Sequence, residues 1–188
     1  MGRFLRTLPL VAAAGLLVAA PACDPHVAEA RGPLVVLARA ARDSMNAAFV
    51  RSNEHWDELA DLNTMERMLG TIRPTQREYL GCLQGEPRGE TVRIDGWVPA
   101  RAMKQLQLAV AGSCDSVPRL VGTWHTHPFR ADQRNLAVKE RRLSPQDLAT
   151  FGGTGLRVTL VMWDRDSIDG ALRTRSGKVV HPARVVVR

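Results

Sequence analysis

The sequence predicts a single α/β or α+β domain with one central mixed sheet flanked by helices. Its 188 residues are enough for one domain with a sizeable core. Apolar residues make up 45% of the chain and charged residues 24%, which is ordinary for a globular protein. Helical and strand-like apolar patterns both occur along the chain, and no internal repeat is present.

Residues 1–22 are predicted to be a signal peptide, because two arginines in MGRFLR precede a long uncharged run. The sequence Ala-Pro-Ala-Cys at 20–23 fits a signal peptidase site. It also fits a lipobox, with alanine at the usual leucine position, which makes Cys23 a candidate for lipid attachment to a membrane. Residues 23–33 then form a polar tether. Cleavage, lipidation and an uncleaved anchor all place residues 34–188 outside the cytoplasm, in the periplasm or the extracellular space.

The basic charge of the chain does not predict a nucleic-acid partner. The net charge of +7 falls to +5 after residue 22, because Arg3 and Arg6 are the only charged residues removed. No stretch interleaves aromatic and cationic residues as a single-strand binder does. Cys82 and Cys114 are an even pair if Cys23 is lipidated, and their spacing leaves open a disulfide or two buried thiols.

The first half of the domain is predicted to contain helices followed by strands. A helical pattern runs from Leu34 to about Arg51, and a second covers residues 54–72 before Pro74. Strands are expected at 78–84 and 91–98, joined by the glycine-rich GEPRGE. MKQLQLAVAG, at 103–112, fits a strand by alternation and a helix by composition, and we favour a strand because RLVGTW follows it.

The second half is predicted to place one short helix among strands. The charged segment FRADQRNLAVKERR, at 129–142, precedes a helix that begins SPQD, with Ser144 as its N-cap and Pro145 in its first turn. Three further strands are expected near the C-terminus, at residues 155–163, 167–174 and 178–187.

The segment GTWHTHPF, at 122–129, suggests a metal site. In a strand, His125 and His127 project to the same face and could share a cation about 2 Å from each nitrogen. Such a pair also occurs without a metal, so a third ligand is needed. Asp147 is the natural candidate, although helix capping alone would also explain it. Glu78 stands at the edge of an otherwise apolar strand, where a charge is costly unless it faces a wet cleft.

These residues resemble the JAMM (MPN+) zinc metalloproteases. Residues 78–85 read EYLGCLQG where the family has E-x-x-G-x-L-x-G, 125–128 read HTHP, and 144–147 read SPQD for S-x-x-D. Gly122 and the Val98-Pro99 pair also look like the family. The resemblance covers roughly residues 65–165, and its elements match in order and in structural context.

The resemblance implies a zinc-dependent peptidase or isopeptidase. His125, His127 and Asp147 would hold Zn²⁺, Glu78 would act as the general base, and Ser144 would donate a hydrogen bond to the oxyanion. The loop from Pro128 to Leu143 is longer than is usual in the family, which makes Asp132 a rival ligand. Export argues against ubiquitin-like substrates, so an envelope peptide, a wall crosspeptide or an exported protein is expected.

The function of the domain and the role of the long loop both have alternatives. An inactive domain of the same fold could bind a partner in the envelope, or the histidines could be incidental in an unrelated binding module; the presence of all four chemical positions favours the enzyme. The basic residues of the long loop could select acidic substrates or simply be solvated. We expect His181 to be structural and Trp124 to lie beneath the histidines. The sequence specifies no oligomeric state.

Overall fold

A computed structural model of the chain describes residues 32–60, 77–106, 109–128, 130–131 and 137–188. Gly32–Arg188 form one compact unit. The predicted signal peptide, Cys23, most of the tether and Asp132 lie outside the described residues. None of the helices in the described part has the length and apolarity that a membrane crossing requires.

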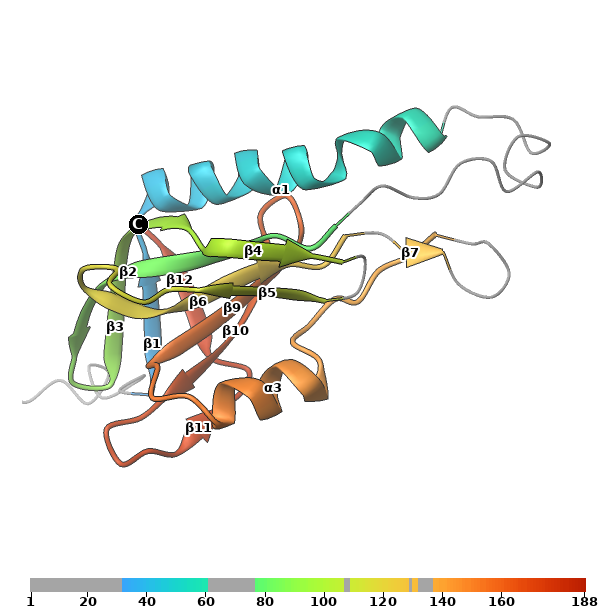
Figure 1. Ribbon diagram of the computed structural model, residues 1–188. Helices are drawn as coiled ribbons and strands as arrows, with labels where there is room; N and C mark the ends of the chain where they lie inside the picture. Colours follow the sequence, from blue (N-terminus) through green and yellow to red (C-terminus); the bar gives the residue numbers. More distant parts are fainter. Residues whose placement is uncertain (1–31, 61–76, 107–108, 129, 132–136) are drawn as a thin grey trace, which may run out of the picture. The chain divides into compact units, whose positions relative to one another are not determined.

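The unit has mixed α+β content, with strands predominating around one large mixed sheet (Figure 1). The eight strands of this sheet lie in the order β11-β10-β9-β6-β2-β3-β1-β12. Its central members are β9 (Val158–Asp164), β6 (Leu120–Thr126), β2 (Leu80–Arg88) and β3 (Thr91–Pro99). β6 pairs parallel with β9 and antiparallel with β2, so the histidine-bearing strand lies inside the sheet.

Two helices in the described residues cover opposite faces of this sheet (Figure 1). Alternate residues of β9 show this, since side chains two apart point to the same face. Val158, Leu160 and Met162 join a core with Ala41, Met45, Ala48 and Phe49 of α1 (Arg39–Ala60). Val161 instead contacts a second core with Phe151 of α3 (Pro145–Gly152).

The predicted helix from Leu34 to Arg51 is wrong at its beginning. Residues 34–37, LVVL, form strand β1, and α1 starts only at Arg39. β1 pairs parallel with β3 on one side and with β12 (Arg184–Val187) on the other. α1 also runs on to Ala60, so the start of the predicted second helix at 54 continues the first; residues 61–76 lie outside the described part.

The strand predictions for the middle of the chain are correct in type and shifted in their bounds. β2 extends to Arg88, so most of GEPRGE belongs to the strands, and the chain turns at Gly89 with φ 63°. The segment 103–112, which we expected to be one strand, is divided between two: β4 (Arg101–Gln105) and β5 (Val110–Ser113) make a separate two-stranded hairpin, and residues 107–108 lie outside the described part. Within the charged segment, β7 (Arg130–Ala131) pairs with β8 (Ala137–Val138).

The C-terminal strands curl the sheet until its two ends approach each other. β10 (Ser167–Arg173) follows β9 as predicted. The predicted strand 178–187 is two strands instead, β11 (Val179–Val180) and β12, separated at His181-Pro182. They lie at opposite ends of the strand order, yet the Ala183 amide beside β12 donates to the Gly170 carbonyl of β10 at 2.7 Å.

Candidate metal centre

Two imidazoles and one carboxylate meet where β6 ends. The Nε2 atoms of His125 and His127 are 3.1 Å apart, and each lies 3.4 Å from a carboxylate oxygen of Asp147. The histidines are buried, with 7% and 6% of their surface exposed. The structure thus brings together the three predicted ligands, whose donor atoms all lie within 4.8 Å of one another.

Main-chain pairing fixes the histidines. His125 lies opposite Leu80 of β2 and Val161 of β9. Just past the strand, the His127 amide donates to the Met162 carbonyl at 2.9 Å. On the His127 ring, Nδ1 lies 3.2 Å from the Glu140 carbonyl oxygen. In the neutral form of His127 with its hydrogen on Nδ1, donation to that carbonyl leaves the Nε2 lone pair available for a cation, as is usual for metal-binding histidines.

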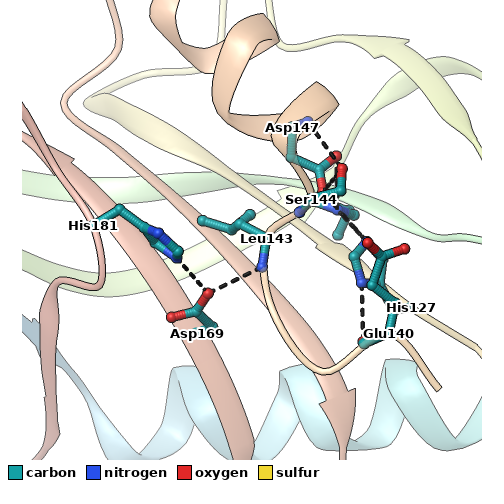
Figure 2. Close-up of polar contacts among 8 residues, drawn as sticks. His127, Glu140, Leu143, Ser144, Asp147, Asp169 and His181 are labelled. Atoms are coloured by element: carbon teal, nitrogen blue, oxygen red, sulfur yellow. Dashed lines mark hydrogen bonds and ion pairs between the residues drawn. The ribbon is translucent and has the colours of Figure 1, made fainter.

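The first turn of α3 orients Asp147 (Figure 2). Ser144 caps the helix: its Oγ accepts from the Asp147 amide at 3.1 Å. In return, Asp147 Oδ2 accepts from Ser144 N and from Ser144 Oγ, both at 2.7 Å. This reciprocal pattern is a capping box, here with aspartate in place of the more common glutamate. The predicted capping role and ligand position of Asp147 therefore coexist.

The surroundings of Asp147 and of His127 shift the pKa of each. Burial by itself raises the pKa of Asp147, but hydrogen bonds from His125, His127 and Ser144 hold it well below its usual range. Burial lowers the pKa of His127, and the interactions with Asp147, Glu78 and the Glu140 carbonyl outweigh this effect and raise it. Asp147 therefore stays ionised, as a carboxylate must be to bind a cation.

Glu78 lies beside the three predicted ligands in an environment that resists its ionisation. Thr126 N donates to the Tyr79 carbonyl and Tyr79 N donates to Thr126 Oγ1, and continuing this antiparallel register sets Glu78 opposite His127. Its side chain is buried, with 8% exposed. Burial raises the pKa of Glu78 from 4.5 to about 7; His127 counteracts this, while Asp147 and Glu140 add to it.

The β4–β5 hairpin holds the main chain of Glu78. The Glu78 amide donates to the Leu106 carbonyl at 3.0 Å, and Gln105 Nε2 donates to the Glu78 carbonyl at 2.9 Å. A disulfide joins Cys82 of β2 to Cys114, which follows β5, with the two Cα atoms 5.6 Å apart. The spacing left open a disulfide or two buried thiols, and the structure has the disulfide. The bond joins the β4–β5 hairpin to β2, the strand that follows Glu78.

The donor atoms of the three predicted ligands have separations close to those around a tetrahedral zinc ion. Nitrogen and oxygen ligands bind zinc at about 2.0–2.2 Å, so two of them around one tetrahedral ion lie about 3.3–3.5 Å apart. The two Nε2 atoms are 3.1 Å apart, slightly closer than this range, and each lies 3.4 Å from a different oxygen of Asp147, Oδ1 for His125 and Oδ2 for His127. Two imidazoles with one carboxylate are a common catalytic zinc set, which leaves the fourth position for water.

Other predicted residues have different surroundings. His181 is apart from the ligands and contacts Asp169, with Nε2 2.7 Å from Oδ2. Trp124 is fully buried, with its ring 4.8 Å from that of Trp97. In the charged segment, Lys139 pairs with Asp164 at 3.1 Å.

Sequence reasoning missed the residues that hold the site. Gln105 and the Glu140 carbonyl support Glu78 and His127, and Asp169 accepts from the Leu143 amide at 3.0 Å. A main-chain carbonyl leaves no signature in a sequence, because every residue has one. Asp169 carried a weak signal, since it is a charged residue in the middle of a strand pattern, where burial without a partner is costly.

Comparison of the sequence with protein-family models and with curated proteins finds no match.

Proposed function

We propose that this protein is a zinc-dependent metallopeptidase of the JAMM (MPN+) type, which hydrolyses a peptide or isopeptide bond outside the cytoplasm. The observation that carries the proposal is one cluster: the donor atoms of His125, His127 and Asp147 within 4.8 Å of one another, with a buried carboxyl, Glu78, close enough to interact electrostatically. The cluster combines a cation site with a group able to move a proton.

His125, His127 and Asp147 would hold the ion. The chemistry that zinc supplies when bound is polarisation of the scissile carbonyl and a lower pKa for water. Glu78, whose pKa is raised to about 7, would accept the proton of the attacking water and deliver it to the leaving amine. A carboxyl with a pKa near ambient pH is suited to both steps, because it gains and loses a proton at little cost.

Ser144 would donate a hydrogen bond to the oxyanion. Its hydroxyl donates to Asp147 Oδ2 in the structure, while Ser144 N makes a second bond to the same oxygen. The hydroxyl hydrogen would therefore have to turn towards the substrate oxygen. The hydrogen bond from the Ser144 amide would then be the one bond from Ser144 that still holds the Asp147 carboxylate. A donor placed in this way stabilises the charge that develops in the transition state.

The fold and the order of its elements support the family proposal. Glu78 precedes β2, His125 lies in β6 with His127 just past its end, and Ser144 with Asp147 starts α3, in the order of the family motif. The extra residues between His127 and Ser144 include the β7–β8 ribbon and do not keep Asp147 from the histidines. An insertion in a loop costs little closure entropy.

The proposed location is outside the cytoplasm, with Cys23 as a lipid anchor or residues 1–22 removed by simple secretion. The Cys82–Cys114 disulfide supports this, because such bonds persist in oxidising compartments. The substrate would then be a peptide or protein of the envelope or an exported protein. Arg141 and Arg142 are exposed three and two residues before Ser144, so an acidic substrate would meet favourable charge there.

The test is zinc content and cleavage of a peptide library, measured on the same preparations. We expect one zinc per chain, lost in His125→Ala and Asp147→Ala and retained in Asp95→Ala, a control that removes an exposed aspartate. Glu78→Gln should keep the zinc and lose cleavage. Zinc without cleavage in the unchanged protein would favour the inactive binding module. Absence of zinc, or full activity in Glu78→Gln, would reject the proposal.

A further inference from the structure

A second acid–imidazole pair lies beside the metal centre without belonging to it (Figure 2). Asp169 of β10 is buried, with 7% exposed, and its Oδ2 accepts two hydrogen bonds. One comes from the Leu143 amide at 3.0 Å, and the other joins His181 Nε2 at 2.7 Å. His181 lies between β11 and β12, so the pair ties the C-terminal segment to the loop that precedes α3.

The bond to Leu143 acts on the residue directly before the capping box. Ser144, the next residue, holds Asp147 Oδ2 through both its amide and its hydroxyl. The Leu143 side chain is itself buried in the core under α3, with Val161 and Phe151. The amide of Leu143 is therefore deep in the protein, where a donor needs a partner, and Asp169 provides it.

We infer that Asp169, held by His181, is a positioning residue for the metal centre: it fixes Leu143 so that Ser144 and Asp147 start α3 within reach of the two histidines. The hydrogen bond from Leu143 to Asp169 acts on Asp147 in two steps: the peptide bond between Leu143 and Ser144, and the capping box between Ser144 and Asp147. It rests on the proposed function only in that the three ligands bind a metal ion, and it does not depend on hydrolysis.

The experiment measures metal affinity of the full chain, with zinc competed against a chromophoric chelator and Co²⁺ absorption reporting ligand geometry. Asp169→Leu keeps the size of the side chain and removes the acceptor. We expect a loss of about 10-fold or more in zinc affinity, as for other groups that orient metal ligands, and an altered Co²⁺ spectrum. Asp169→Asn retains an oxygen that accepts from Leu143, so it should recover most of the affinity.

Two further variants separate positioning from stability. Leu172→Ala removes a fully buried side chain from the same strand and should lower stability while leaving zinc affinity unchanged. His181→Leu should lower affinity in the same direction as Asp169→Leu and by less, because the Leu143 bond survives. If Asp169→Leu does not fold, His181→Leu serves as the test variant in its place.

The outcomes are distinguishable. Folded Asp169→Leu with the affinity and Co²⁺ spectrum of the unchanged protein would overturn the inference and leave the proposed function standing. If Asp169→Leu does not fold, an unchanged affinity in His181→Leu has the same consequence. If the unchanged protein binds neither zinc nor Co²⁺, the proposed function fails first and the inference fails with it.

Discussion

Glu78 carries a free-energy cost that its proposed role explains. Burial and the nearby carboxylates of Asp147 and Glu140 disfavour an ionised side chain at this position. A neutral amide there would make the folded protein more stable, yet the chain has an acid. Active sites commonly keep ionisable groups with shifted pKa values at the expense of stability. The cost should be measurable in the metal-free protein, because the pKa of Glu78 differs between the folded and the unfolded chain.

We therefore predict that Glu78→Gln stabilises the metal-free protein at pH 8 and much less at pH 5.5. The folded protein binds the Glu78 proton more tightly than the unfolded chain, with a pKa of about 7 against 4.5. Stability from this group is thus lost as pH rises through this range, by up to about 3 kcal/mol. Urea unfolding with a chelator at both pH values is the measurement, with Glu86→Gln at an exposed position as control. The same effect at both pH values would contradict the raised pKa.

Single residues also show how much of the site could be predicted from the sequence. His125, His127, Asp147 and Glu78 were predictable because their side-chain chemistry is itself the signal. The glycines between them have a packing explanation: a Cβ on Gly81 would lie 2.1 Å from Trp124 Nε1, and one on Gly122 would lie 1.9 Å from the Val158 carbonyl. The support from Gln105 and Asp169 depends on contacts between distant segments, which no local pattern encodes.

Among the elements, α3 is the one whose start the sequence predicted best. Ser144 followed by Pro145 and Asp147 is a local capping signal, and local signals survive in any tertiary context. The β1 strand shows the opposite case. LVVL has the apolar spacing of a helix as well as the β-branched residues of a strand, and its partner β12 lies at the far end of the chain. Only the fold decides between the two.

The capping box should couple helix stability to metal binding. Ser144→Ala removes the hydroxyl that bonds both the amide and the carboxylate of Asp147. We expect a loss of about 1 kcal/mol in unfolding free energy without metal. Zinc affinity should fall as well, because one bond that orients the ligand is gone. Ser144→Thr, which can make the same bonds, is the control. An unchanged zinc affinity in Ser144→Ala would mean that the Ser144 amide alone orients Asp147.

The disulfide and the β4–β5 hairpin should affect Glu78, the proposed base, and not the proposed metal ligands. We expect Cys82→Ala with Cys114→Ala to lower the unfolding free energy by about 3–4 kcal/mol, since the bond closes a loop of 32 residues. Zinc affinity should stay the same, because the proposed ligands lie at the end of β6 and in α3. Cleavage should fall by about 10-fold or more, because the hairpin holds both main-chain groups of Glu78. Loss of zinc together with the disulfide would contradict this separation.

The whole unit depends on contacts between its two ends. β1 lies between β3 and β12, the Arg39 amide donates to the Arg188 carbonyl, and the Arg188 amide donates to the Leu37 carbonyl. The fold class could be predicted from the mixture of periodic segments. The curl that brings β12 towards β10 could not, because it follows from pairing across almost the full length of the unit.

Two truncations test where the folding unit begins. Removal of residues 1–31 deletes nothing from the compact unit Gly32–Arg188, so we expect unchanged thermal stability and unchanged zinc affinity.

Removal of residues 1–38 differs by only seven residues but also deletes β1. It leaves the inner edges of β3 and β12 without partners and removes the fully buried Val35 and Leu37 from the core. Burying each of these side chains contributes about 1.5–3 kcal/mol, and unpaired buried main-chain groups add to the loss. The shorter chain should therefore fail to fold, as judged by circular dichroism and thermal melting. A cooperative melt of the shorter chain close to that of the longer one would show that β1 is dispensable and that the unit begins with α1.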